Sequence, residues 1–161
     1  MHDDLSKIIE SVVRNIISDS ESDDVRLTLS LAKKLAEKIE LKATEIGVRA
    51  VVAIADAAAR PILAQCMDDA YIASYDIAVN KAYTSVALKM STAELKKISQ
   101  PGESLYGVQF TNSGQIVIFG GGEPLKYNGK VIGGLGVSGG SEEQDTFLAA
   151  YGEEIFSKLL I

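Results

Sequence analysis

The stretch that most constrains the fold runs from residue 116 to residue 145, where runs of glycine alternate with short apolar segments. The β-branched and aromatic run 116–119 predicts a short strand. Gly120-Gly121-Gly122 ends it, because residues without a Cβ leave the backbone free to turn or to approach another segment closely. Asn128-Gly129, between two apolar runs, predicts a tight β-hairpin, since both residues tolerate the left-handed conformations of a type I′ turn.

The end of this stretch predicts a helix. Gly139-Gly140 stops the second strand of the hairpin, and the spacing of Ser141 and Gln144 is that of a capping box. The helix is expected to run from Glu142 to about Leu160. Free N–H groups at its start could hold a carboxylate or phosphate, but plain capping is the simpler interpretation.

The composition is that of a single domain without disulfides. A chain of 161 residues can bury roughly 70% of the surface of its unfolded state. Cys66 is the one cysteine, which fits a reducing compartment, and its apolar neighbours predict an inert thiol in the core. No apolar run approaches the ~20 residues that span a bilayer, and nothing resembles a signal peptide. We therefore expect a cytoplasmic protein without a membrane partner.

The acidic charge is concentrated at the N-terminus. Residues 1–24 contain seven acidic and two basic residues, and residues 25–161 contain fifteen and fourteen. The second region is therefore nearly neutral and has no basic stripe, which argues against a nucleic-acid partner.

Three regions follow from this pattern. Residues 1–18 place Leu, Ile and Val at helical spacing and predict an amphipathic helix. Residues 19–24 contain no apolar side chain and predict a polar linker, and residues 25–161 form the domain. Residues 1–18 resemble the short peptides that direct enzymes into bacterial microcompartments, so we expect them to dock on a shell or cargo protein. The alternative is that this helix packs on the domain itself.

The domain is expected to begin with a helix over residues 25–46, capped by Asp23 or Asp24 and ended at Gly47. The apolar runs 48–55 and 62–67 predict two strands of an antiparallel hairpin.

A further helix is expected over residues 71–90. Its apolar positions cover more than one stripe and alternate with alanines, so we expect several neighbours, including a second subunit, and a homo-oligomer larger than a dimer. Ser91 and Glu94 predict another capping box, and residues 105–110 form a strand or a covering loop. The expected fold is α/β: a central antiparallel sheet of about five strands between helices, in three α/β/α layers.

The sequence contains few groups for catalysis. The only histidine is His2, and no pattern of metal ligands occurs, so we predict neither a catalytic residue nor a metal site. Asp68-Asp69 is interpreted as a turn. Gly133-Gly134-Leu135-Gly136 lies inside a strand and lacks the context of a dinucleotide fingerprint. Asp76 and Lys81 lie in an apolar helix, where each is expected to snorkel to solvent, to cap or to form an ion pair rather than to catalyse. The alternative for Lys81 is a role in a pocket.

Several motifs resemble the GlcG/HbpS family, and most closely the C-terminal domain of PduO-type proteins of propanediol utilisation. They occur in order over about 110 residues and comprise the DIA-x-NKA-x-TS-x-A-x-KM run from Asp76 to Met90, QPG at 100–102 with LYG at 105–107, FGGG-x-PL at 119–125, and IGGLGVSGG at 132–140 followed by Gln144-Asp145.

The resemblance implies a profilin-like α/β/α fold, assembly into higher oligomers, and haem binding. It also implies a link to corrinoid metabolism, because PduO proteins join this domain to an adenosyltransferase. In haem-binding relatives, a histidine of the first domain helix is the expected axial ligand, and residues 25–46 contain none. Haem would need another ligand, and the candidates are Met67, Tyr71, Lys81 and Tyr106.

We therefore expect a non-enzymatic, oligomeric accessory protein inside a bacterial microcompartment, binding haem or a related tetrapyrrole. The alternatives are an enzyme or cobalamin-related factor acting on a small carbonyl or corrinoid compound, and a purely structural scaffold. The residues expected at the ligand site are Asp76, Lys81, Tyr106, Gly120, Gly121, Gly122, Gln144 and Asp145.

Overall fold

The computed structural model describes residues 7–13 and 25–160. The domain contains four strands and four α-helices, with two short 3-10 turns over residues 108–114. The helices are α2 (Leu29–Glu45), α3 (Ser74–Ala87), α4 (Thr92–Ile98) and α5 (Glu142–Leu159). The strands are β1 (Val51–Asp56), β2 (Pro61–Cys66), β3 (Gly122–Tyr127) and β4 (Lys130–Ser138).

All strand pairs in the described sheet are antiparallel, and the order is β2-β1-β4-β3. Both predicted hairpins are confirmed. The turn between β3 and β4 has φ of +48° at Asn128 and +77° at Gly129, as a type I′ turn requires. The expected count of about five strands is one too high for the described residues.

The predicted strand over residues 116–119 is wrong. Ile116 and Val117 are buried, but the backbone of this segment bonds to a side chain of α3 instead of a neighbouring strand. The Val117 N–H donates to Thr84 Oγ1 at 3.0 Å, and the same hydroxyl lies 3.3 Å from the Gln115 carbonyl. Apolar content therefore buried Ile116 and Val117, and the Thr84 hydroxyl took the place of a neighbouring strand as the partner of the Val117 N–H.

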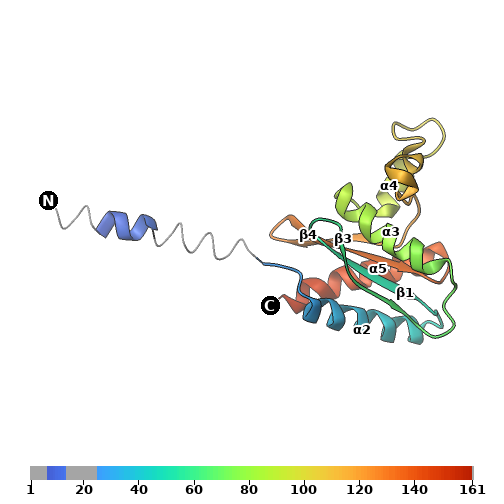
Figure 1. Ribbon diagram of the computed structural model, residues 1–161, viewed down its shortest axis with the longest axis horizontal. Coiled ribbons are helices and arrows are strands. Elements are labelled where there is room, and N and C mark those ends of the chain that lie inside the picture. Colours follow the sequence, from blue (N-terminus) through green and yellow to red (C-terminus); the bar gives the residue numbers. More distant parts are fainter. Residues whose placement is uncertain (1–6, 14–24, 161) are drawn as a thin grey trace.

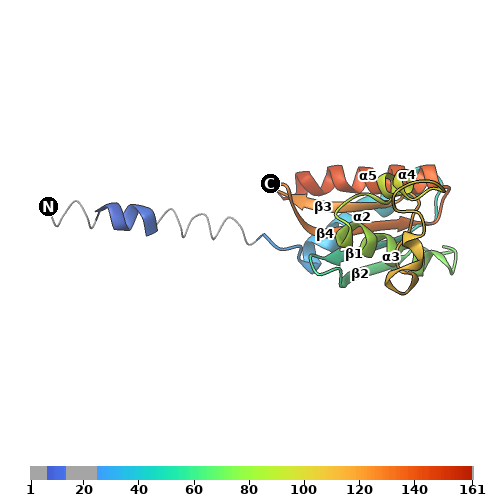
Figure 2. The same cartoon turned by 90° about the horizontal axis from the view of Figure 1, so that it is seen from above.

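The three predicted layers are present, with α2 and α5 on one face of the sheet and α3 on the other (Figures 1 and 2). The larger core lies between the sheet and the α2/α5 pair, and includes Leu35, Val52, Leu135 and Phe156. The smaller core lies between the sheet and α3 and consists of small side chains, such as those of Ala53 and Ala78.

Glycines of β4 let α3 lie directly on the sheet. A Cβ on Gly136 would meet the Ala78 carbonyl oxygen at 1.9 Å, and one on Gly134 would meet the Ala82 carbonyl oxygen at 2.5 Å. The side chain of Leu135, between them, is fully buried on the opposite face. The Gly-rich motif of this strand is thus explained by close helix packing.

Several predicted boundaries shift. Helix α2 begins at Leu29 with Thr28 as its N-cap, whereas the proposed caps Asp23 and Asp24 lie outside the described residues. Helix α3 is shorter than residues 71–90. The prediction of a core thiol is also wrong, because Cys66 is exposed at the end of β2, which is an edge strand.

Residues 7–13 form a helix, and each of them is exposed. Figure 1 draws this helix apart from the domain. The remainder of the predicted helix over residues 1–18 and the whole linker over residues 19–24 lie outside the described residues. No helix in the described part of the chain is long and apolar enough to cross a membrane.

Candidate functional site

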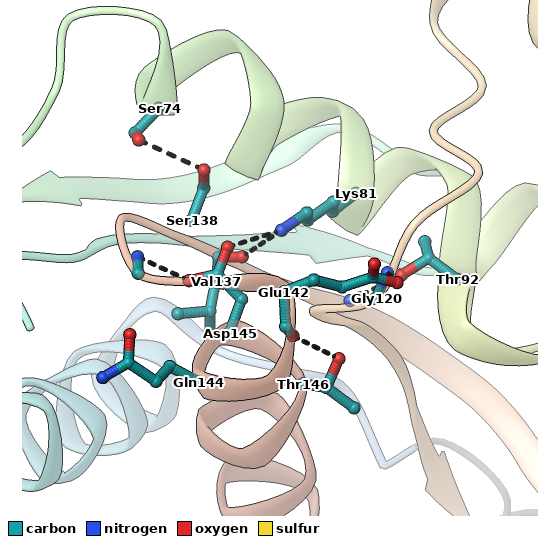
Figure 3. Close-up of polar contacts among 12 residues, drawn as sticks. Ser74, Lys81, Thr92, Gly120, Val137, Ser138, Glu142, Gln144, Asp145 and Thr146 are labelled. Atoms are coloured by element: carbon teal, nitrogen blue, oxygen red, sulfur yellow. Dashed lines mark hydrogen bonds and ion pairs between the residues drawn. The ribbon is translucent and has the colours of Figure 1, made fainter. Parts of the chain in front are cut away.

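Lys81 is the most unusual side chain of the domain, because it is a charged group with no exposed surface. Helix α3 places it beside the start of β3, where its Nζ donates to the Val137 carbonyl at 2.8 Å and to Asp145 Oδ2 at 2.9 Å (Figure 3). The ammonium also lies 5.0 Å from the centroid of the Phe119 ring. A buried ammonium needs such partners, since an unpaired charge is costly in the protein interior.

The glycine turn makes room for this ammonium. Gly121 has φ of +111°, and a Cβ there would lie 2.6 Å from Lys81 Nζ and 2.7 Å from the Val137 carbonyl oxygen. Gly120 and Gly122 are equally confined, because a Cβ on them would meet Thr146 Oγ1 at 1.9 Å and Thr92 Cγ2 at 2.7 Å. The three glycines are therefore required by space, and Gly121 also by its backbone conformation.

Two side chains hold the turn to its neighbours. Glu142 of α5 accepts from the Gly120 N–H at 3.0 Å and from Lys96 of α4 at 2.5 Å. Thr92 of α4 accepts from the Gly122 N–H at 2.9 Å. The bond from the Gly120 N–H, followed by the bond from Lys96, lowers the pKa of Glu142 below its ordinary range.

The N-terminus of α5 is already capped. Asp145 Oδ1 accepts from the Gly140 N–H at 2.9 Å, and the capping box of Ser141 and Gln144 is present as predicted. The first turn also carries Glu142 and Glu143. These acids and caps complement the positive end of the helix dipole, as the simpler interpretation of plain capping predicts. Close packing explains Gly139, because a Cβ there would lie 2.2 Å from the Arg49 carbonyl oxygen.

The electrostatics of this cluster are those of a structural cross-link. Burial lowers the pKa of Lys81, and the carboxylate of Asp145 opposes that change. The described contacts of the ammonium are all with protein groups, namely the Val137 carbonyl, Asp145 and the Phe119 ring. Among the described residues, no group of three or more His, Cys, Asp or Glu side chains is placed to hold a metal ion.

The structure brings together five of the eight residues predicted at the ligand site: Lys81, Gly120, Gly121, Gly122 and Asp145. Gln144 lies next to them in the capping box. Asp76 is exposed on α3, and Tyr106 is 63% exposed in the segment after α4. In the described part of the chain, Asp76 and Tyr106 therefore lie outside the cluster that the other six residues form.

Sequence reasoning missed a second feature, an exposed apolar surface at the start of α3. Tyr71, Ile72 and Tyr75 are 73%, 97% and 48% exposed. Tyr71 also lines a cavity of about 450 Å³ together with Arg49, beside the glycines that precede α5. The position of these apolar residues could have revealed this surface. They lie before the helix or in its first turn, outside the alanine stripe that packs on the sheet.

The comparisons with known proteins agree with this fold. Residues 27–154 match the family described as haem-degrading, HbpS-like proteins. An uncharacterised 15.0 kDa protein from the dhaT–dhaS intergenic region of Citrobacter freundii is 51% identical over 133 residues, which are 83% of this chain and 94% of that protein. The corrinoid adenosyltransferase PduO of Salmonella typhimurium is 40% identical over 80% of this chain, but the chain spans only 38% of its length.

Solved structures with the same fold include two at 39% identity or more. Protein ORFY of Klebsiella pneumoniae has a TM-score of 0.81 and 46% identity, covering 84% of this chain and 94% of that one. The PduOC:heme complex has a TM-score of 0.78 and 39% identity, covering 81% of this chain and 94% of that one.

Proposed function

The chain belongs to the HbpS-like family, and we propose that it is a non-enzymatic accessory protein that binds haem or a related tetrapyrrole in a bacterial microcompartment. The observation that carries this proposal is the similarity to the PduOC:heme complex, a haem-bound protein that matches over 94% of its chain at 39% identity. The PduO relatives suggest the setting, propanediol utilisation and corrinoid metabolism.

Two of the four candidate axial ligands of haem are exposed and suit that role. Lys81 is unsuited to hold iron, because it is fully buried and its ammonium is engaged by Asp145. Met67 is half-buried, and its sulfur lies 3.3 Å from the Ala50 N–H. Tyr71 and Tyr106 present exposed phenols, and a tyrosine is a known type of axial ligand.

Tyr71 is the better placed of the two tyrosines. It shares its cavity with Arg49, whose guanidinium suits a propionate, and its neighbours Ile72 and Tyr75 expose apolar surface for a flat macrocycle. In this proposal Tyr71 would hold the iron and Arg49 a propionate. When bound, haem would supply redox and ligand-binding chemistry, while these residues bind and orient it.

The same surface supports the proposed oligomer. Ile72 is almost completely exposed. Exposure of this apolar side chain to water costs free energy in an isolated subunit, and a second copy that covers the side chain would remove that cost. A homo-oligomer larger than a dimer would shield the apolar surface and the open face of the ligand. A monomeric mass by light scattering at micromolar concentration would contradict this part of the proposal.

Hemin titration of the purified chain tests the ligand. We expect a shifted Soret band that saturates at a fixed stoichiometry. Tyr71→Phe should change the spectrum and weaken binding at least tenfold, whereas the control Tyr106→Phe should not. Linear, unsaturable absorbance, or equal behaviour of both variants and the unmodified chain, would contradict haem binding at Tyr71.

A second candidate is an enzyme acting on a corrinoid or small carbonyl compound, and it is favoured by the corrinoid adenosyltransferase relatives. Turnover of cob(I)alamin or of small aldehydes by the purified chain would support it over the accessory role.

A further inference from the structure

Two apolar surfaces of this chain lack a partner among the described residues, and they are joined by a short stretch of sequence. The first is the stripe of the helix over residues 7–13. Ile8, Ile9, Val12 and Val13 are 47–60% exposed. Residues four apart share one face of a helix, so the pairs Ile8/Val12 and Ile9/Val13 form one continuous stripe.

The second surface is a groove of about 420 Å³ at the end of the sheet where the chain enters the domain. It lies between the segment before α2, the β1–β2 turn and the β3–β4 hairpin. We call it the entry groove. Its apolar lining residues are Val25, Leu27, Ile62, Val131 and Ile132, and its other lining residues are Arg26, Asp56, Ala57, Ala58 and Lys130.

Leu27 fixes the shape of the entry groove. Its side chain is buried against Gly133 of β4, where an added Cβ would meet Leu27 Cδ2 at 2.4 Å. Leu27 therefore holds the segment before α2 across the end of the sheet. Val25 and Val131, on either side, are only half-buried and leave apolar surface open.

The connection between the two surfaces is long enough for them to meet. Eleven residues, 14–24, separate the helix from Val25. They span at most about 36–40 Å when fully extended, and about 27–29 Å if residues 14–18 continue the predicted helix, which rises about 1.5 Å per residue. The tether ends at Val25, which itself lines the entry groove. A short tether of this kind gives an effective concentration in the millimolar range, which favours weak contacts within one chain.

Charge favours the same contact. Residues 1–24 carry a formal charge of −5, from seven acidic and two basic residues. Lys130 is exposed at the rim of the entry groove. Asp56, the acid of the groove, is engaged within its own turn, because its Oδ1 accepts from the Ala58 and Arg60 N–H groups at 2.8 and 2.9 Å.

We propose that the entry groove binds the helix of residues 7–13 of the same chain through its stripe of Ile8, Ile9, Val12 and Val13. Docking would withdraw this stripe from any other protein. If residues 1–18 also recruit a shell or cargo protein, as their resemblance to targeting peptides predicts for a protein of a microcompartment, the two contacts compete, and the groove regulates recruitment. Only this competition rests on the proposed function; the docking itself does not.

Paramagnetic relaxation in the full chain tests the docking without any shell protein. A spin label is attached to Lys7→Cys in a Cys66→Ser background. We expect the amide signals of residues 130–132 to lose at least half of their intensity. Val131→Asp, which changes the groove, should restore the intensity of these signals. The double variant Ile9→Asp/Val13→Asp, which leaves the groove intact, should restore it as well. The matched control Leu41→Asp places the same charge on an exposed apolar residue near the C-terminal end of α2, away from the entry groove, and should leave the broadening unchanged.

The outcomes separate the alternatives. Groove signals of full intensity in the labelled chain would overturn the proposal, as would broadening that survives Ile9→Asp/Val13→Asp. Mixing spin-labelled chains with isotope-labelled chains that lack the spin label tests for a second copy. Broadening in that mixture equal to that within one chain would overturn docking in the same chain and assign the groove to a neighbouring subunit. Loss of microcompartment targeting, in contrast, would leave the relaxation result unaffected.

Discussion

Lys81 Nζ lies 2.9 Å from Asp145 Oδ2, although 64 positions separate the two residues in sequence. The pair joins α3, on one face of the sheet, to the first turn of α5, on the other. The ion pair lies beside Gly121, where a side chain would collide with the ammonium of Lys81. This contact ties together the two outer layers of the fold.

Removing one member of this pair should strongly destabilise the domain. Lys81→Met leaves Asp145 buried without its cation, and breaking a buried pair typically costs about 3–5 kcal/mol. The double variant Lys81→Met/Asp145→Leu removes both charges and should recover a large part of that loss. Urea unfolding of the three proteins measures the difference. A loss below about 1 kcal/mol for Lys81→Met would contradict the assigned role.

Substitution of Gly121 should be more damaging than that of a glycine in open space. Gly121→Val adds strain at φ of +111° and drives a branched side chain into Lys81 and the Val137 carbonyl. We expect little folded protein, or a Tm at least ~8 °C lower. Gly102→Val is the control, since Gly102 also has positive φ, of +92°, but nothing within 4 Å of a Cβ. Circular dichroism measures the Tm of both variants. An equal decrease in Tm for Gly121→Val and Gly102→Val would rule out crowding as the cause.

Glu123 should make stability depend on pH. Burial on the edge strand β3, reinforced by Glu153 and Glu94 and opposed by Lys126, raises the pKa of Glu123 from an ordinary value of 4.5 to about 7. The folded state then holds the proton more tightly than the unfolded state, so this group costs stability as pH rises from about 4.5 to 7, and the full cost remains above 7.

Glu123→Gln removes that ionisation. We expect it to raise the free energy of unfolding at pH 8 and to change it little at pH 5, as measured by urea titration at both values. The control Glu103→Gln, at an exposed position, should change neither. Stabilisation of equal size at pH 5 and pH 8 would show that ionisation of Glu123 is not responsible.

The N-terminal helix should direct a reporter into microcompartments. Residues 1–20 fused to a fluorescent protein should form puncta in cells that make the cognate shell. Ile8→Asp and Val12→Asp should disperse them, because a charge on the docking stripe must be desolvated. Glu10→Gln, on an exposed residue of the same helix, is the control. Diffuse fluorescence of the unmodified fusion would refute targeting.

Local signals in the sequence determined much of the fold. Asn128-Gly129 predicted the hairpin, because few other pairs tolerate positive φ at both positions. The capping boxes at Ser91 and Ser141 predicted the starts of α4 and α5, since each depends on residues three apart. The apolar periodicity of the helices and the antiparallel hairpins were sufficient to predict the three-layer arrangement.

The tertiary structure decided what depends on distant partners. Residues 116–119 have the composition of a strand, but Thr84 of α3 binds their backbone, and a segment cannot specify such a partner from 33 positions away. Cys66 has apolar neighbours in sequence, yet it is exposed because the sheet places β2 at an edge.

The same division holds for the site. The sequence indicated that Lys81 and the glycine turn matter, because a lysine in an apolar helix and three successive glycines each require an explanation. Only the fold determined that they explain each other. Burial of the ammonium depends on the approach of α5 and on the space left by Gly121, and both arise from packing between elements, which no local spacing encodes.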